Sequence, residues 1–390
     1  MLRQAESLPA LHLETGAELP TIQKAPTGIG AFIGITQDGP LNRAVRLTGI
    51  ADFLTVFGDF NPAVEAGYAV SQFFKNGGRE AWFVRVGRDS RASDIVGNSA
   101  DGTGIFALDA VDLFNLLCIP ALSHLPDWEL QSALAPIRQY CQSRRGMLLF
   151  DLPPELVEPN GVKRWLAEHE SLRHPNVISF FPRLKIVDPL NMNLHRLIGP
   201  SGTIAGAFAR HDFNHQVWSE PCGGELPLLG VMGLGYSLSD EEAAFLNSLG
   251  INGLRKFGEF GTVIAGSRTT IQAEASDSNW RSIAARRLSF MIQESLHRGT
   301  EWVSDRWNDE KLWEQLREQV SAFMQQLYEE QAFQGTTAAD SFFVKCDAET
   351  NPSAEQDRGR VLLWAGFAPS EPGKFVILKL CRRAKKQRLA

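Results

Sequence analysis

Short apolar segments alternate with amphipathic ones over much of the chain. Five apolar segments have the length and composition of buried strands: residues 29–35, 81–86, 114–119, 146–150 and 176–181. Helical periodicity marks segments between and after them, at residues 62–75, 127–143, 161–173 and 201–211. Strands that alternate with helices form βαβ units, so we predict an α/β fold with a mostly parallel sheet core and flanking helices.

Local signals predict where some helices begin and end. Asn61 followed by Pro62 is typical of a helix start, with Asn as N-cap and Pro at the first position. The Asn-Gly-Gly turn at 76–78 predicts the end of that helix, because glycine adopts the left-handed C-cap conformation without strain. Ser239 and Glu242 form a capping box that predicts a further helix.

The last part of the chain has a different character. Two long helices, 279–298 and 308–333, precede three separated strands at 341–345, 361–365 and 374–380. This order predicts an α+β module distinct from the α/β part.

We therefore divide the chain into four parts. They are an extended N-terminal arm at 1–25, an α/β body at 26–255, an α+β C-terminal module at 256–370, and a C-terminal arm strand with a basic tail at 371–390. A polar, glycine-rich stretch at 87–104 predicts a further boundary inside the body. The N-terminal arm lacks helical periodicity, and the alternation at residues 10–14 suits one short strand.

Composition narrows the function classes. The 390 residues are 44% hydrophobic and 22% charged, which is ordinary for a globular protein with more than one core. The net charge of −6 argues against a nucleic-acid-binding surface over the whole molecule. Five scattered cysteines without a C-x-x-C pair form neither a disulfide framework nor a zinc cluster, and they favour a reducing compartment.

Targeting signals are absent from the sequence. The first residues contain no apolar signal core, and no apolar run approaches the roughly 20 residues that a membrane helix needs. We expect cytoplasmic assembly, no stable membrane insertion and no nucleic-acid partner. The basic tail at 382–388 keeps one alternative open, a monomeric module that binds nucleic acid or an anionic membrane.

Two motifs resemble cofactor or metal sites, but each lacks part of the pattern. The glycines at 28–34 are spaced like a dinucleotide loop, yet Pro26 precedes them and β-prone residues follow, where that loop needs a strand and then a helix. His211 and His215 have the i, i+4 spacing of a helical metal site, without a third ligand or a general base. We expect no cofactor and no metal, and a surface or capping role for these histidines.

Ser201 lies at an expected strand-to-helix turn. A serine nucleophile needs a positioned base and an orienting acid. His195 and Asp188 are candidates, but no spacing singles them out, and a helix N-cap explains Ser201 more simply. We expect no catalytic residue and no enzyme. An α/β enzyme such as a hydrolase stays an open alternative, because a fold alone never excludes catalysis.

The helix at 308–333 carries an apolar stripe with 3.6-residue periodicity, which is typical of a core helix. Its opposite face is polar and includes Lys311, Glu314, Glu318 and Gln325. This face is available to another protein, although spacing alone does not identify the partner.

Many short motifs occur in an order that resembles the sheath proteins of contractile phage tails and related injection systems. They include Gly-Pro-Leu at 39–41, Gly-Tyr-Ala-Val at 67–70, Asn-Gly-Gly-Arg at 76–79, Pro-Ser-Gly at 200–202, Gly-Ser-Arg-Thr at 266–269, Ile-Gln-Glu-Ser at 292–295, Leu-Trp at 312–313, Phe-Phe-Val at 342–344 and Cys-Asp at 346–347. The chain departs from the family at residues 9–15, where many members begin with a P-G-V-Y-hydrophobic-E-E strand.

The resemblance implies a mechanical function. Sheath subunits stack helically, in six-fold rings, around an inner tube between a baseplate and a terminator or cap. The sheath then shortens and drives the tube through a target envelope. This implies that the chain belongs to a phage tail or phage-tail-like particle, whether phage, bacteriocin or injection system.

The resemblance also implies that terminal arms of neighbouring subunits complete the sheet of the C-terminal module. A strand without partners of its own satisfies its backbone groups by adding to the edge of another sheet. The residues that we assign to these inter-subunit strands are Leu11, Leu13, Phe375, Val376, Ile377, Leu378 and Leu380. We assign the polar face at Lys311, Glu314, Glu318 and Gln325 to the inner tube.

Overall fold

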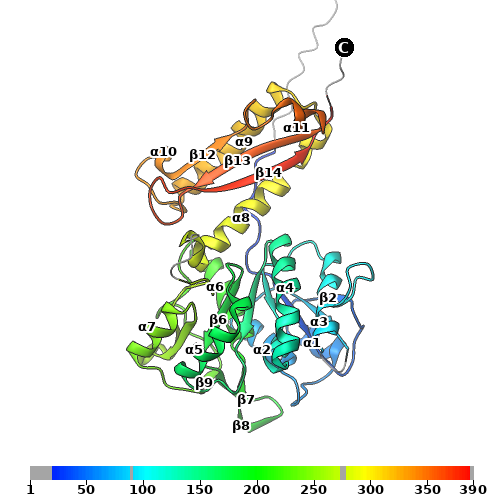
Figure 1. The fold of residues 1–390 in the computed structure, drawn as a ribbon. Helices are drawn as coiled ribbons and strands as arrows, with labels where there is room; N and C mark the ends of the chain where they lie inside the picture. The colour runs from blue at the N-terminus through cyan, green and yellow to red at the C-terminus, as the bar shows by residue number, and fades with distance from the viewer. Residues whose placement is uncertain (1–19, 88–90, 273–277, 387–390) are drawn as a thin grey trace, which may run out of the picture.

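The computed structural model describes residues 20–87, 91–272 and 278–386. It consists of a large α/β body and a smaller C-terminal module, with the helix α8 (Ile283–Gly299) between them (Figure 1). The predicted fold class, a mostly parallel α/β core followed by an α+β module, is confirmed.

The body is built on one eight-stranded sheet with the order β11-β10-β6-β5-β4-β1-β3-β2. Its strands are β1 (Gly30–Gly34), β2 (Ala44–Leu47), β3 (Ala81–Arg85), β4 (Leu116–Cys118), β5 (Met147–Asp151), β6 (Val177–Phe181), β10 (Asn252–Lys256) and β11 (Thr262–Ala265). The six inner strands run parallel, and the two edge strands are antiparallel to their neighbours.

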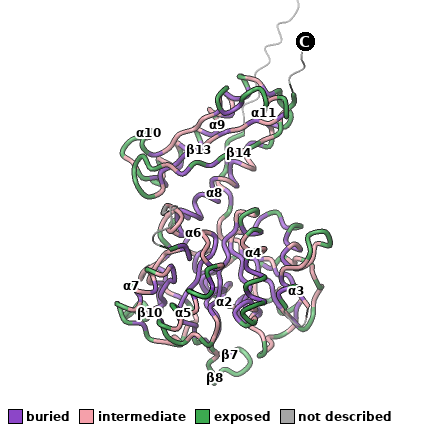
Figure 2. Tube along the Cα trace, viewed as in Figure 1, coloured by how far each residue is buried: buried purple, intermediate pink, exposed green. Residues whose placement is uncertain are grey.

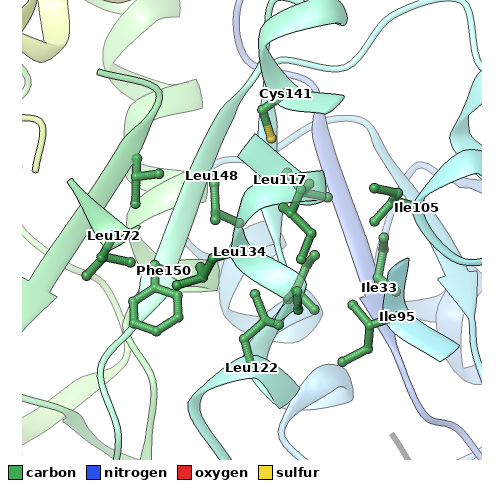
Figure 3. Close-up of a cluster of buried hydrophobic side chains, with 14 of the residues drawn as sticks. Ile33, Ile95, Ile105, Leu117, Leu122, Leu134, Cys141, Leu148, Phe150 and Leu172 are labelled. Carbon is green, nitrogen blue, oxygen red and sulfur yellow. The ribbon is translucent and has the colours of Figure 1, made fainter. Parts of the chain in front are cut away.

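Helices cover both faces of this sheet. One face packs against α3 (Ala92–Val96), α4 (Asp127–Ser143), α5 (Pro159–Glu168) and α7 (Asp240–Ser248), and the other against α1 (Ile50–Phe57), α2 (Ala66–Lys75) and α6 (Ser201–His215). In β5, Leu148 and Phe150 belong to the first core, together with Leu134 of α4 (Figure 3), whereas Met147 and Leu149 belong to the second. Because both faces of the sheet are buried, successive residues of a strand are all apolar.

A small antiparallel sheet, in the order β8-β7-β9, projects from the body at the lower edge of Figure 1. Its strands are β7 (Leu184–Asp188), β8 (Asn191–Ile198) and β9 (Val231–Leu234). The sequence analysis did not predict it. Residues 191–195 of β8 alternate between polar and apolar side chains, but the apolar ones, Met192 and Leu194, are exposed to solvent rather than buried in a core.

The C-terminal module is a two-layer structure. Helices α8 and α9 (Glu310–Glu329) pack on one face of an antiparallel sheet in the order β12-β13-β14, formed by β12 (Phe342–Lys345), β13 (Arg360–Phe367) and β14 (Val376–Arg383). Two short helices, α10 (Ala338–Ser341) and α11 (Ser353–Asp357), lie in its connections. Figure 2 shows the buried interior of this module separated from that of the body by α8.

Several element boundaries differ from the predicted ones, and three differences concern a helix start or the division of the body. The helix predicted at Pro62 begins at Ala66, because the side chain of Asn61 instead accepts a hydrogen bond from the Ala63 N–H in a local turn. The body sheet continues through β11, beyond residue 255. The stretch at 87–104 does not divide the body, because its helix α3 buries Ile95 in the same core as Ile33 of β1.

Two helix signals are confirmed. The capping box of Ser239 and Glu242 is present at the start of α7, with both reciprocal hydrogen bonds. Helix α2 ends at Lys75, and Gly77 follows with φ +105°, the left-handed region that favours glycine. No described helix has both the length and the apolar character needed to cross a membrane.

Candidate assembly surfaces and the junction between body and module

The C-terminal strand β14 pairs with β13 of its own chain. The antiparallel register runs from Val376 opposite Phe367 to Arg383 opposite Arg360, over the whole length of both strands. The expectation that this segment has no partner within its own subunit is therefore wrong for the single chain. Its exchange between subunits stays a prediction.

Alternating burial explains why β14 folds onto its own module. Val376 and Leu378 are each 7% exposed and join the core beneath the sheet, and Leu380 packs against the same core. Ile377 points to the other face and is 47% exposed. Phe375, just before the strand, packs against Phe343 with ring centroids 5.2 Å apart. The side chains of the apolar run that suggested an unpaired arm thus lie alternately on the two faces of a sheet.

The sheet leaves two edges for further strands. In the described part of the chain, β12 has β13 as its only strand neighbour. Beyond the end of β14, Lys385 forms an isolated β-bridge with Trp307. Free edge groups of this kind accept an added strand from another chain. The predicted N-terminal arm residues, Leu11 and Leu13, lie outside the described residues.

The polar face predicted for the inner tube lies on α9. Lys311, Glu314 and Glu318 are exposed, while Gln325 is half-buried and donates a hydrogen bond to Glu329 at 2.9 Å. All four residues are thus near the outer side of the helix, away from the core stripe that includes Leu316 and Val320. The identity of their partner stays a prediction.

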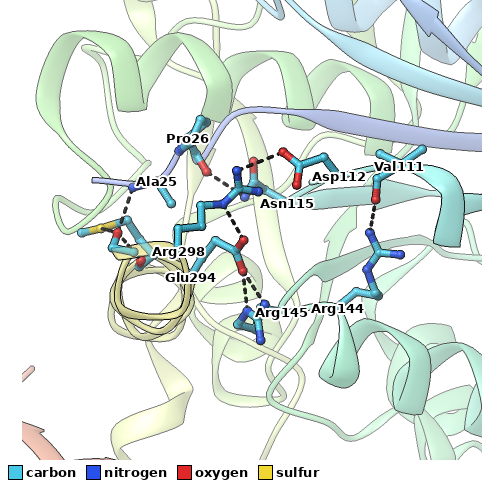
Figure 4. A network of polar contacts seen from close by, with 11 residues as sticks. Ala25, Pro26, Val111, Asp112, Asn115, Arg144, Arg145, Glu294 and Arg298 are labelled. Carbon is cyan, nitrogen blue, oxygen red and sulfur yellow. Dashed lines mark hydrogen bonds and ion pairs between the residues drawn. The ribbon is translucent and has the colours of Figure 1, made fainter. Parts of the chain in front are cut away.

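Residues 20–29 form a strap that runs along α8 from the module to the body. At the module end, the Lys24 ammonium lies 2.7 Å from the Glu330 carboxylate. Along α8, the Ala25 N–H donates to Ser295 Oγ at 2.8 Å (Figure 4). The strap passes so close to the helix that a Cβ at Gly299 would lie 2.6 Å from Ile22. Glycine is therefore required at that point.

An ionic cluster ties α8 to the body (Figure 4). The Glu294 carboxylate accepts hydrogen bonds from Arg145 of the body, at 2.6 Å, and from Arg298 one turn further along α8, at 2.7 Å. Arg298 also reaches Asp112 of the body at 2.9 Å. Burial alone would raise the pKa of Glu294, but the hydrogen bonds and charges of the two arginines outweigh it and leave the pKa below its usual value.

A second ion pair at the junction is more deeply buried. Arg287 of α8 and Asp212 of α6 have side chains that are 3% and 6% exposed, and the guanidinium donates to both carboxylate oxygens, once at 2.9 Å. Arg287 also donates to the Thr27 carbonyl of the strap at 3.0 Å. Helix α8, helix α6 and the strap therefore meet at one side chain. The sequence showed no signal for this pair, because its members lie 75 positions apart.

Ser201 is not arranged as a nucleophile. It is the first residue of α6 rather than its N-cap, so the predicted N-cap role is wrong. Its side chain is buried, and its hydroxyl donates to Asp151 at 2.6 Å while its N–H donates to the other oxygen at 2.8 Å. The candidate partners point elsewhere: His195 is exposed on β8, and Asp188 pairs with Arg196.

A cavity of about 330 Å³ opens where β1 and β4 end, at the edge where α/β enzymes often bind ligands. Glu65, His124 and Glu129 line it. The Glu65 carboxylate is held by Arg183, by His124 and by the Gly199 N–H, and Glu129 accepts from the Ala92 N–H. These carboxylates thus already have structural partners.

Asp151 supplies a pH-dependent prediction. Burial raises its pKa to about 6, although the charge of Arg183 and the hydrogen bonds from Ser201 lower it. The native state therefore binds more protons than the unfolded state between about pH 4 and 6, and this carboxyl lowers stability as pH rises through that window. We expect Asp151→Asn to stabilise the unassembled protein at pH 7.5 by on the order of 2 kcal/mol.

Urea unfolding of both proteins at pH 7.5 and pH 4.5 measures this effect. The gain should shrink toward pH 4.5, where the native carboxyl is already largely protonated. Equal destabilisation of the Asn variant at both pH values would contradict the raised pKa and show that the two hydrogen bonds that Asp151 accepts from Ser201 dominate its contribution.

The two histidines of α6 lie close together, with ring centroids 5.3 Å apart. His211 is 6% exposed, so the predicted surface role is wrong for this residue. Within residues 20–87, 91–272 and 278–386, no group of three or more His, Cys, Asp or Glu side chains is placed to hold a metal ion.

The fold defined by this body and module is that of contractile tail sheath proteins. The PVC sheath of an extracellular contractile injection system, in its contracted state, superposes with a TM-score of 0.75 at 22% sequence identity, covering 97% of this chain and 98% of that one. The contracted helical sheath of the anti-feeding prophage (AFP) gives 0.72 at 21% identity, covering 96% and 99%. The sheath tail protein of Desulfitobacterium hafniense gives 0.61 at 11% identity, covering 98% and 100%.

The sequence comparison agrees for the C-terminal part of the chain. Residues 275–380 match the family described as the phage tail sheath C-terminal domain. This range contains all of α8 and α9 and the strands of the module as far as Leu380. No curated protein sequence matches the chain. The resemblance to tail sheath proteins is therefore confirmed, by sequence over the module and by fold over nearly the whole chain.

Proposed function

We propose that this protein is the structural subunit of a contractile sheath, which polymerises helically around an inner tube and shortens to drive that tube through a target envelope. The observation that carries the proposal is the match of fold to sheath proteins over 97% of the chain, with almost complete coverage of those proteins in return.

The same comparison supports a set of partners for this protein. The related structures are sheaths in the contracted state and subunits within the AFP baseplate. We infer that this protein contacts copies of itself in six-fold rings, an inner tube, a baseplate and a terminator or cap. Assembly takes place in the cytoplasm, and the product is a phage tail or phage-tail-like particle.

Terminal strands couple the subunits in this proposal. Strands from neighbours add to the free edges of β12 and β14, and β14 itself exchanges between modules. The strap anchors the N-terminal arm, because it contacts α8, the module and the body. A force applied to the arm is therefore distributed over all three. The driving free energy lies in the contacts of the assembled lattice, with the extended form kinetically trapped.

Expression of the protein alone tests the proposal. We expect purified protein to sediment as large particles above a threshold concentration, and negative-stain microscopy to show hollow tubes of uniform diameter. Discrete globular particles at every concentration would contradict the proposal and favour one of the two alternatives, an enzyme or a monomeric binding module.

A further inference from the structure

The C-terminal module has two outer surfaces on opposite sides. The sheet covers one side, and α9 lies behind it on the other (Figure 1). Residues that face neither the core between these layers nor another described element are available for contacts with other molecules. The two surfaces differ in charge.

The outer side of the sheet is aromatic and cationic. Trp364 of β13 lies between its register partners, Lys345 of β12 and Lys379 of β14, whose ammonium groups are 5.8 and 5.1 Å from the ring. Ile377 and Arg383 are exposed on the same side of β14. Lys345 pairs with Glu349, whereas Lys379 and Arg383 form no ion pair with any residue in the described ranges. We call these five residues the cationic sheet face.

The outer side of α9 is predominantly acidic, with three exposed glutamates and one exposed lysine, Lys311. Glu310, Glu314 and Glu318 follow one another at four-residue spacing, which places them on one face of the helix. All three are exposed, and none has an ion-pair partner in the part of the chain that the structure describes. Like charges at this spacing repel, so this acidic stripe is unfavourable for an isolated module.

A groove of about 450 Å³ lies beside the acidic stripe. Its lining includes Glu318 together with the apolar side chains of Ile22, Ala322 and Phe323. The rest of the lining includes Gln315, Gln319 and Gln326. A partly apolar groove beside an acidic stripe complements the cationic sheet face, where Trp364 and Ile377 are flanked by basic residues. Apolar centres with charged rims are the usual anatomy of a protein interface.

We propose that the cationic sheet face of one copy docks on the acidic stripe and groove of α9 in a second copy. The two surfaces lie on opposite sides of one module, so the contact is head-to-tail and generates an open stack rather than a closed dimer. Each contact is small compared with the roughly 20 to 30 residues a side of a stable interface. A single contact of this size is therefore weak, and it stabilises the assembly because it is repeated between many subunits of the lattice.

This inference rests on the proposed function and adds to it a contact that edge-strand exchange does not provide. It also assigns the acidic stripe to a neighbouring subunit rather than to the inner tube. If β14 is exchanged, Lys379 and Arg383 come from a neighbour, but every module still presents the same face.

Charge reversal tests the contact, because every copy carries both surfaces. We expect Lys379→Glu with Arg383→Glu, or Glu314→Lys with Glu318→Lys, to raise the concentration needed for assembly about tenfold. The chain that combines all four changes should assemble within about threefold of the unchanged protein, since the charges are again complementary. Sedimentation against protein concentration, with circular dichroism to show that each variant is folded, provides the readout.

A matched control reverses two exposed acids of the body, Glu155→Lys with Glu168→Lys, and should leave the threshold unchanged. Unaffected assembly of both two-residue module variants would overturn the contact, as would a four-residue variant no better than either. Normal self-assembly of the α9 variant with loss of binding to purified inner tube protein would place the stripe against the tube instead. If the unchanged protein never assembles, the proposed function itself fails.

Discussion

Removal of residues 374–390 should abolish assembly and unfold the C-terminal module, while the body stays folded. Strand β13 would lose its ladder from Arg360 to Phe367. The core beneath it would lose Val376 and Leu378, whose burial contributes roughly 3 to 6 kcal/mol together. That amount is comparable with the whole stability of a small domain. The body retains its two cores, neither of which includes residues of β14.

Limited proteolysis and negative-stain microscopy measure the two effects. We expect rapid cleavage within residues 300–373, a protected body fragment and no tubes. A chain that ends at Lys386 is the matched control, because it keeps β14 and the bridge at Lys385, and it should behave like the full protein. Normal tubes from the chain that ends at residue 373 would show that the strand is dispensable, both for the module and for coupling.

The buried ion pair at the junction should give the largest effect of a single substitution. Arg287→Ala leaves the Asp212 carboxylate buried without its cation, and breaking a buried pair in this way costs about 3 to 5 kcal/mol. The same change releases the strap carbonyl at Thr27. We expect a correspondingly lower free energy of unfolding for the unassembled protein in urea, with looser docking of α8 on the body.

Arg298→Ala is the control on the same helix. The Arg298 side chain is 37% exposed, and Glu294 keeps Arg145 as a partner, so the cost should be at most about 1 kcal/mol. Replacing both members of the buried pair, with Arg287→Met and Asp212→Leu, should recover much of the loss, since no uncompensated charge remains. Equal losses for Arg287→Ala and Arg298→Ala would contradict the role given to burial.

Much of the fold could be predicted from the sequence because it rests on local patterns. The limits of α4 agree with the predicted 127–143, and the capping box of α7 forms as expected, since both depend on neighbouring residues. The apolar strands of the body also appear where predicted. The β7-β8-β9 sheet was not predicted, although residues 191–195 of β8 alternate between polar and apolar side chains, because this short signal has no helix or buried strand beside it in the sequence pattern.

The assembly surfaces show where local patterns stop being sufficient. The apolar run from Phe375 to Leu380 is a strand signal, but it does not say which chain supplies the partner, and in the single chain the partner is β13. The ion pair of Arg287 and Asp212, and the row formed by Lys345, Trp364 and Lys379, bring together residues distant in sequence. Such pairings follow from the topology and become visible only in three dimensions.

Cryo-electron microscopy of the assembled protein tests the central claim most directly. We expect a helical tube in which at least one β-strand of each C-terminal module is hydrogen-bonded to a strand of a neighbouring subunit. Particles without helical order, or a tube in which no strand crosses between subunits, would contradict the account.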